Sequence, residues 1–339
     1  MRIIHVHNLM NRKYGLFNST YGKKINNGFV QNNHYVLEFS DRDTVRNEAF
    51  LKMRWLGYKA VNQKLIETCI NFEPDILVLG HTDLIVPEAI ARIRALLPKI
   101  KIAHWSMDAL FNFKNIERLN SYQSSVDSIF ITSGFDGIKQ FKDTHKFSFI
   151  PNPCDIAIEA QNNSLKVDFE TDLLFCGRGD KEDYRYSFVK ELQEKIPRGV
   201  NFKTFGLHGG ASIFGTSYDS MLKKTKMGLN LNRQEGWPLY SSDRIAQLVG
   251  NGVLTFLWDR GCMRSLLSDT HAVYFNSLED LAEKIEFFQK NDLERQRIAE
   301  AGYNFYQKEF SSKKVASYII QTLLGEKYTE EYFWHGIDV

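Results

Sequence analysis

The sequence has few of the features that mark several common protein classes. Its 339 residues include only four cysteines and seven prolines, and 43 basic residues stand against 41 acidic ones. A formal charge of +2 argues against a dedicated nucleic-acid binder, whose basic stripe would show in the totals. Cys69, Cys154, Cys176 and Cys262 lie far apart without CxxC spacing. We therefore expect free thiols in a reducing compartment, with no disulfide framework.

Long apolar runs are also missing. Spanning a bilayer takes about 20 consecutive apolar residues, and no stretch of the chain reaches that length. The first residues, MRIIHVHNL, predict a short strand and lack the long apolar segment of a signal peptide. No HExxH or similar ligand spacing occurs, so we expect no metal. The expected location is the cytoplasm, with contact to the inner face of a membrane as an additional option.

What the chain does have is a regular alternation of buried strands and amphipathic helices. In the first half this pattern predicts helices near 44–56, 59–72, 87–97 and 136–142. Alternation at this spacing is typical of a parallel sheet covered by helices on both faces. The strands are expected at 3–6, 35–39, 75–80, 101–105, 128–132 and 147–150.

The sequence Pro151-Asn152-Pro153 interrupts the pattern, and the aperiodic residues 155–168 follow it. The alternation then restarts, with strands expected at 173–177, 202–206, 227–231, 252–257 and 272–275 and helices at 180–196, from Ser277, at 292–308 and at 312–324. We therefore predict an α/β protein with two Rossmann-like parallel-sheet domains that face each other across a cleft. The expected domains are 1–152 and 165–320. Ligands of such sheets bind at the carboxyl ends of the strands.

The segment Leu229 to Asp259 carries the clearest functional signal. A strand ends in alternating amides, and a short helix begins where serine and aspartate supply N-cap chemistry. A helix N-terminus with arginines beside it suits a phosphate group. The residues predicted to bind the ligand here are Asn230, Asn232, Arg233, Ser241, Ser242, Asp243 and Arg244.

A glycine turn follows the first strand of the second half. Gly177-Arg178-Gly179 could bring backbone N–H groups and a guanidinium to a diphosphate. An ordinary strand-to-helix turn is the alternative. The turn is not a dinucleotide fingerprint, because the third glycine would fall at position 182, where the chain has Glu182.

At this point the chain resembles the GT-B glycosyltransferases, and within them the CgeB-like branch related to spore maturation proteins. The resemblance is carried mainly by the second half and more loosely by the first. The matching segments are FCGRG at 175–179, NLNR at 230–233, DRIAQ at 243–247, GNGVL at 250–254, DLAEKI at 280–285 and RIAEAG at 297–302, with EPDIL at 73–77 and HWSMD at 104–108.

The resemblance implies transfer of a sugar from a nucleotide-activated donor to a saccharide or lipid-linked acceptor, in cell-surface polysaccharide or glycan synthesis. It implies no metal and no cofactor besides the donor, which the second domain would hold. It also implies that the tail 321–339 crosses back to the first domain. Gln247 stands where the family usually has a glutamate that holds a donor hydroxyl. An alternative alignment pairs Glu235 with Asp243 as in retaining enzymes.

An inverting transfer needs a group that takes the acceptor's proton, and strand ends of the first half offer three candidates. Asp108 is the first choice, His81 the second, and Asp43 a third. A retaining transfer would need no such base. Two other functions remain open: a non-catalytic nucleotide-sugar-binding protein of the same fold, which Gln247 would favour, and a sugar-nucleotide epimerase.

Overall fold

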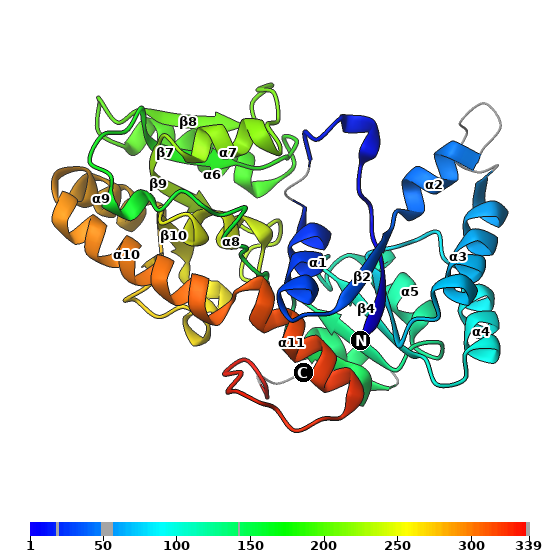
Figure 1. The fold of residues 1–339 in the computed structure, drawn as a ribbon. Helices are drawn as coiled ribbons and strands as arrows, with labels where there is room; N and C mark the ends of the chain where they lie inside the picture. The colour runs from blue at the N-terminus through cyan, green and yellow to red at the C-terminus, as the bar shows by residue number, and fades with distance from the viewer. Residues whose placement is uncertain (18–19, 49–56, 142, 337–339) are drawn as a thin grey trace. The chain divides into compact units, whose positions relative to one another are not determined.

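The structure is a computed structural model that describes residues 1–17, 20–48, 57–141 and 143–336. The chain divides into two compact units. Unit 1 comprises residues 1–153 and 312–339, and unit 2 comprises residues 154–311 (Figure 1). Unit 2 thus ends at Ser311 rather than at the predicted residue 320, because the helix that follows packs into unit 1.

Unit 1 is built on one parallel sheet of six strands in the order β2-β1-β3-β4-β5-β6. Buried residues dominate its central strands, as expected for strands covered on both faces. The strand β3 (Ile76–Gly80) is fully buried. The others are β1 (Arg2–Val6), β2 (Tyr35–Phe39), β4 (Lys101–Ser106), β5 (Ser128–Ile131) and β6 (Phe147–Phe149).

The helices of unit 1 cover both sides of this sheet. The helix α11 (Ser312–Leu324) lies along α1 (Tyr21–Gln31), and it also contacts β4 and β5 (Figure 1). Short 3-10 turns occupy Asn11–Lys13, Phe135–Gln140 and Thr144–Lys146. The remaining helices are α2 (Asp41–Glu48), α3 (Tyr58–Phe72), α4 (Pro87–Leu96) and α5 (Phe113–Tyr122).

The residues after α11 also belong to unit 1. Trp334 and Tyr332 are buried, and the Tyr332 hydroxyl contacts Ser317 and Gln321 of α11 at 3.0 and 3.2 Å. The tail is therefore held against α11 by its own buried aromatic side chains. Within the described residues, no helix combines the length and apolar character needed to cross a membrane.

The contact between α1 and α11 depends on Gly28. A Cβ at this position would lie 2.0 Å from the carbonyl oxygen of Ser312 and 2.8 Å from the Cβ of Ala316. Gly28→Ala should therefore force the two helices apart and lower the free energy of unfolding by about 2 kcal/mol or more, despite alanine's better helix propensity. Urea unfolding followed by circular dichroism measures this. Val30→Ala, at a half-exposed site on the same helix, is the control and should change stability little. Equal midpoints for the two variants would contradict the prediction.

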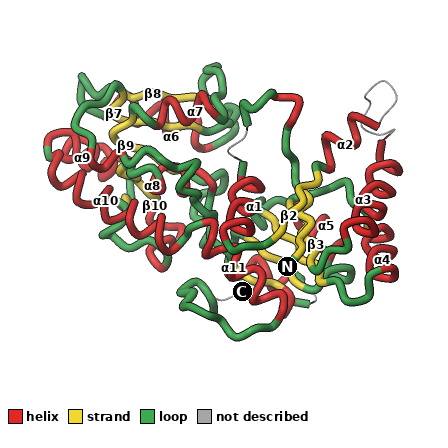
Figure 2. The backbone as a smooth tube through the Cα atoms, viewed as in Figure 1, coloured by secondary structure: helices red, strands yellow, loops and turns green. Residues whose placement is uncertain are grey.

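Unit 2 has a parallel sheet of five strands in the order β11-β10-β9-β7-β8, and its secondary structure is easiest to follow in Figure 2. The strands are β7 (Thr171–Cys176), β8 (Phe202–Phe205), β9 (Thr225–Asn230), β10 (Leu254–Trp258) and β11 (Val273–Phe275). The helices are α6 (Tyr184–Lys195), α7 (Thr216–Leu222), α8 (Asp243–Gly250), α9 (Leu278–Lys290) and α10 (Asp292–Glu309), with 3-10 turns at Asn163–Leu165, Asp259–Gly261 and Met263–Ser265.

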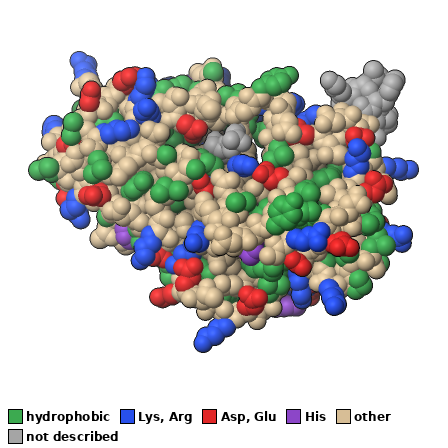
Figure 3. Space-filling model, viewed as in Figure 1, with side chains coloured by type: hydrophobic (Ala, Val, Ile, Leu, Met, Phe, Trp, Pro, Cys, Tyr) green, Lys and Arg blue, Asp and Glu red, His purple; other side chains and the backbone are tan. Residues whose placement is uncertain are grey.

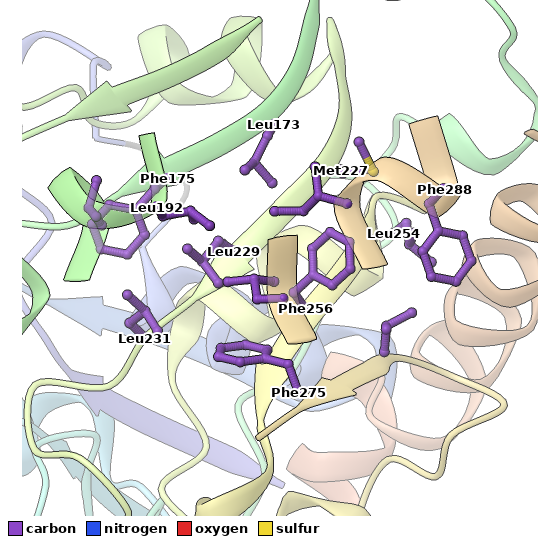
Figure 4. Packing of buried hydrophobic residues seen from close by; sticks show 14 of the residues in the cluster. Leu173, Phe175, Leu192, Met227, Leu229, Leu231, Leu254, Phe256, Phe275 and Phe288 are labelled. Carbon is purple, nitrogen blue, oxygen red and sulfur yellow. The ribbon is translucent and has the colours of Figure 1, made fainter. Parts of the chain in front are cut away.

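Alternate residues of the unit 2 strands face two different cores. Leu173, Phe175, Leu229 and Phe256 point to the side covered by α6 and α9, where Leu192 and Phe288 meet them (Figure 4). The opposite side holds a smaller cluster around Leu174, with Leu222 of α7 and Leu248 of α8. Because the side-chain period of a strand is two, Asn230 points to the α8 side, opposite to its neighbours Leu229 and Leu231.

The predicted alternation of strands and helices is confirmed, with four exceptions among the helices. The pattern did not predict α1, α5 or α7, and the helix expected at 136–142 is a 3-10 turn. The helix expected at 44–56 is present as α2 up to Glu48, and residues 49–56 lie outside the described part. Residues 155–168 are packed into unit 2: Asn163 is buried and its amide donates to the carbonyls of Leu222 and Thr225 at 2.7 and 2.9 Å.

Candidate functional site

Strand order identifies where a ligand can enter each sheet. Ligands of open α/β sheets bind at the carboxyl ends of the strands, at the point where the strand order reverses. In unit 1 this point lies between β1 and β3, and in unit 2 it lies between β7 and β9. The residues directly after these four strands are therefore the candidates for contact with a ligand.

In unit 1 this position is filled by aromatic rings. The indole N–H of Trp105 donates to Nε2 of His5 at 3.0 Å, and both residues are buried. A Cβ at Gly80 would lie 2.2 Å from the Trp105 ring, and a Cβ at Gly22 would lie 2.5 Å from Nδ1 of His7. The backbone at the end of β3 and at the start of α1 is therefore covered by side chains of the protein. Burial lowers the pKa of His5 well below its usual value, so its ring is neutral.

In unit 2 the corresponding position is lined by Gly177 and Arg244. Gly177 follows β7, and a Cβ there would lie 3.3 Å from Nη2 of Arg244 and 2.7 Å from the ring of Phe175. Arg244 is the second residue of α8, and its guanidinium lies over the Phe175 ring with 5.2 Å to the centroid. The glycine thus lets a guanidinium approach the end of the central strand.

The partners of Arg244 are all uncharged. Its Nη1 donates to Oδ1 of Asn230 at 3.1 Å and to the carbonyl of Leu231 at 3.0 Å. No carboxylate of the described residues lies within ion-pair distance of it. Burial lowers the pKa of Arg244, although a guanidinium stays charged at neutral pH. A positive charge this enclosed, without an acidic partner, is favourable when an anion binds beside it.

Asn230 connects this arginine to the start of α8. Its Oδ1 accepts a hydrogen bond from Arg244 and a second one, at 3.0 Å, from Oγ of Ser242. Ser242 is the N-cap residue of α8, but its side chain caps no backbone N–H. The predicted serine cap is therefore wrong in detail, because the hydroxyl donates to Asn230 instead. The N-terminus of α8 keeps backbone donors close to Arg244, an arrangement that suits phosphate.

The other residues predicted for this site are more scattered. Arg178 and Arg233 are exposed, Asn232 is half-buried, and Ser241 is buried where its hydroxyl meets Tyr306 of α10. Glu235, the first acidic residue of the alternative alignment, forms an ion pair with Arg260. Asp243 is the first residue of α8, where its charge suits the helix dipole. Gln247 lies one turn further along α8 and is half-buried.

Sequence reasoning missed several residues that shape this site. The hydroxyl of Tyr184 donates to the carbonyl of Asn232 at 2.6 Å, which holds the loop after β9 against α6. Arg185 is buried, pairs with Asp183 at 2.5 Å, and donates to the carbonyl of Arg178 at 2.7 Å. A small cavity lies between these elements, lined by Tyr184, Asn230, Asn232, Gly236, Leu257, Trp258, Gly261 and Met263.

Two of the three candidate catalytic residues meet in unit 1. Nε2 of His81, directly after β3, lies 3.5 Å from Oδ2 of Asp108, in the loop after β4. Arg118 of α5 reaches both: its Nη2 lies 3.4 Å from the Asp108 carboxylate and 3.2 Å from Nδ1 of His81. The same nitrogen donates to Oγ of Ser106 and Oδ1 of Asn115, at 3.1 and 2.5 Å. The guanidinium is thus held in one place.

The environment of His81 keeps its ring neutral. Burial and the charge of Arg118 lower the pKa of His81 to about 4, although Asp108 acts in the opposite direction. His81 also has a φ of 41°, in the left-handed region that a residue other than glycine seldom adopts. Strain of this kind is often found at functional sites. A pKa this far below 7 makes His81 a weak base at neutral pH, so its neutral ring is better suited to hydrogen bonding than to taking a proton.

Asp43 has different neighbours. Its Oδ2 accepts from the Ser40 hydroxyl at 2.6 Å and from the Asn11 N–H at 3.1 Å, and Arg46 lies 3.8 Å from Oδ1. The side chain is buried in these contacts, which join the start of α2 to the loop after β1. The structure therefore brings His81 and Asp108 together and gives Asp43 a different set of partners.

One protein-family model matches the second half of the chain and continues into α11, past the end of unit 2. Residues 185–321 match the family model described as glycosyl transferase-like. That match covers α6 to α11 and therefore includes Asn230, Arg244 and the start of α8. Among curated proteins, none matches the chain.

Solved structures match the chain over almost its whole length. HepE from Anabaena, in complex with UDP and glucose, is similar with a TM-score of 0.62 at 12% identity, covering 96% of this chain and 100% of that one. Sucrose-phosphate synthase from Thermosynechococcus elongatus matches with a TM-score of 0.58 at 10% identity (96% and 99% covered). A UDP-N-acetylglucosamine 2-epimerase matches with a TM-score of 0.53 at 9% identity (98% of each chain). The predicted fold is confirmed: two parallel-sheet, Rossmann-like domains of the GT-B type.

Proposed function

We propose that the protein is a glycosyltransferase that moves a sugar, a hexose or a related sugar, from a nucleotide donor to a saccharide or lipid-linked acceptor. The proposal places it in cell-surface polysaccharide or glycan synthesis. It includes the CgeB-like branch of the GT-B enzymes as the proposed branch. The match of residues 185–321 to a glycosyl transferase-like family supports the reaction class.

The observation that carries the proposal is Arg244, a largely enclosed guanidinium with only neutral partners at the reversal point of the unit 2 sheet. A departing nucleoside diphosphate would supply the missing negative charge. Arg244 and the first N–H groups of α8 would stabilise that charge as it develops. Positive charge from the protein removes the need for a metal, so we propose a metal-independent reaction without a further cofactor.

We propose that the donor is a sugar linked to UDP. HepE was solved with UDP-glucose and with UDP alone, which supports this choice. In unit 1, Asp108 would accept the proton of the acceptor hydroxyl, and His81 would assist it. The proposed location is the cytoplasm, and a lipid-linked acceptor would bring the protein to the inner face of the membrane.

A donor panel tests the proposal directly. The purified protein is titrated with UDP, GDP, CDP and CMP in a calorimeter, and release of UDP from UDP-sugars is then followed with mixed acceptor saccharides. We expect UDP to bind most tightly and at least one UDP-sugar to lose its UDP. Binding of none of the nucleotides would overturn the proposal.

Two alternatives give different results in the same assay. An epimerase, the function named for two of the structural neighbours, would convert UDP-N-acetylglucosamine to its 2-epimer without an acceptor and without net sugar transfer. A non-catalytic binding protein would bind UDP-sugars without changing them. Analysis of the nucleotide-sugar pool by NMR distinguishes these outcomes from transfer.

A further inference from the structure

The charged groups around His81 are balanced in sign. Two guanidinium groups and two carboxylates act on the ring, those of Arg118, Arg42, Asp108 and Asp83. They form two ion pairs: Arg118 lies 3.4 Å from Asp108, and Arg42 lies 3.4 Å from Asp83. We call these five residues the His81 cluster. Because His81 is neutral, the cluster carries no net charge.

Unit 2 differs in this respect, because the positive charge at its strand ends is not balanced by a carboxylate partner among the described residues. There Arg244 faces only an amide oxygen, a backbone carbonyl and an aromatic ring. An anion that approached the His81 cluster would meet two carboxylates, whose repulsion would offset the attraction of the arginines. The two sets of strand ends are therefore suited to ligands of different charge.

The cluster is nevertheless partly accessible and rich in hydrogen-bonding groups. The side chain of Asp108 is 39% exposed and that of Asp83 is 45% exposed, while Arg118 is only 14% exposed. Beneath them His104 is fully buried, and neither of its ring nitrogens has a hydrogen-bond partner in the described structure. Nε of Arg118 and Nε of Arg42 likewise have no partner there. Because these unpartnered nitrogens are buried, the groups that a ligand can reach are the exposed carboxylates of Asp108 and Asp83 and the partly exposed ring of His81.

Hydroxyl groups match this pattern better than phosphate or carboxylate groups do. A hydroxyl both donates and accepts, so two adjacent hydroxyls can donate to a carboxylate while they accept from a guanidinium or an imidazole N–H. Asp108 beside Arg118 and His81 offers this combination within 3.5 Å. Neither ion pair would have to be broken to admit such a ligand.

We infer that the His81 cluster binds a neutral saccharide through adjacent hydroxyls, so that the acceptor residue carries no phosphate or carboxylate at the contacted positions. The inference rests on the proposed glycosyltransferase function, and it narrows the acceptor to an uncharged sugar unit. A lipid-linked acceptor would then present a neutral sugar here, with its phosphates elsewhere.

The test follows the ring resonances of His81 by NMR in the full-length, histidine-labelled protein saturated with UDP, with His81→Gln used for assignment. Maltose, cellobiose and lactose are the neutral probes. Glucuronate and glucose 6-phosphate are the anionic probes, added at equal concentration. We expect at least one neutral disaccharide to shift the His81 signals in a saturable manner, with an affinity about tenfold or more above that of either anionic sugar.

A charge variant sharpens the test. Asp83→Asn leaves Arg42 without its carboxylate and should move the preference toward glucose 6-phosphate by severalfold. Asp127→Asn is the matched control, because Asp127 is also half-exposed and paired with an arginine, Arg94, but at the amino-terminal ends of β4 and β5. It should leave the preference unchanged.

Two results would overturn the inference. One is tighter binding of an anionic sugar than of every neutral sugar in the unmodified protein, and the other is no shift of His81 with any probe. If UDP still binds in either case, only the acceptor assignment fails. If UDP does not bind, the proposed function fails independently of what His81 reports.

Discussion

Replacing Arg244 with glutamine should weaken UDP binding by about 30-fold or more. Glutamine can still contact Asn230, but it removes the enclosed positive charge beside Asn230 at the end of β9. Losing a buried, hydrogen-bonded charge on one side of an ion pair costs 2 to 5 kcal/mol, which corresponds to roughly 30-fold or more in affinity. Calorimetric titration with UDP measures the change. Arg244→Lys keeps the positive charge but lacks the planar guanidinium. Its affinity for UDP should therefore lie between those of the unmodified protein and the Arg244→Gln variant.

The matched control is Arg297→Gln on α10, an exposed arginine that pairs with Glu294 at 2.5 Å. It should bind UDP as the unmodified protein does. Thermal unfolding of all variants separates lost binding from lost folding, because Arg244 also hydrogen bonds the carbonyl of Leu231. A folded Arg244→Gln variant that binds UDP within twofold of the unmodified protein would exclude the phosphate role.

Asp108→Asn should lower the rate of sugar transfer by a factor of about 100 to 10,000, the usual contribution of a general base. Asparagine preserves the shape of the side chain but cannot take the acceptor's proton. UDP affinity should stay unchanged, since Asp108 belongs to unit 1 and the proposed donor site belongs to unit 2. Initial rates at saturating donor, together with calorimetry, measure both quantities. Asp127→Asn again serves as the control.

The neighbours of Asp108 make the result informative in either direction. If His81→Gln reduces the rate more than Asp108→Asn does, the histidine is the base and the carboxylate positions it across the 3.5 Å contact. If neither variant falls below half of the original rate, the reaction proceeds without a base, as a retaining transfer would.

Much of the fold follows from hydrophobic periodicity, but the place of an individual polar side chain does not. The helix α5 reads FKNIERLNSY, and its apolar residues Phe113, Ile116, Leu119 and Tyr122 recur every three positions, so the sequence does carry a helical pattern here. That pattern contains no information on which groups Arg118 meets, and its place beside His81 and Asp108 depends on the packing of α5 in the fold. The positions of His81 and Asp108 after strands were predictable, because the strands and the residues at which they end could be predicted from the sequence.

Polar side chains that form their hydrogen bonds within the protein are equally hard to place from the sequence alone. Residues 155–168 show no apolar period, yet Asn163 is fully buried because its amide donates to two backbone carbonyls. Ser242 has the residue type and position of an N-cap, but the nearby Oδ1 of Asn230 takes its hydrogen bond. Such choices depend on which side chain the fold brings within reach, and a local pattern of residue types does not contain that information.

The return of α11 to unit 1 has a consequence for how the chain is made. During synthesis the first 153 residues leave the ribosome before their last helix exists, because residues 154–311 must be translated first. Unit 2 is continuous and can complete its folding while unit 1 still lacks the helix that packs against Gly28. A fragment that ends at residue 153 would leave that face of α1 uncovered, so unit 1 alone should be obtained only when residues 312–339 are joined to it.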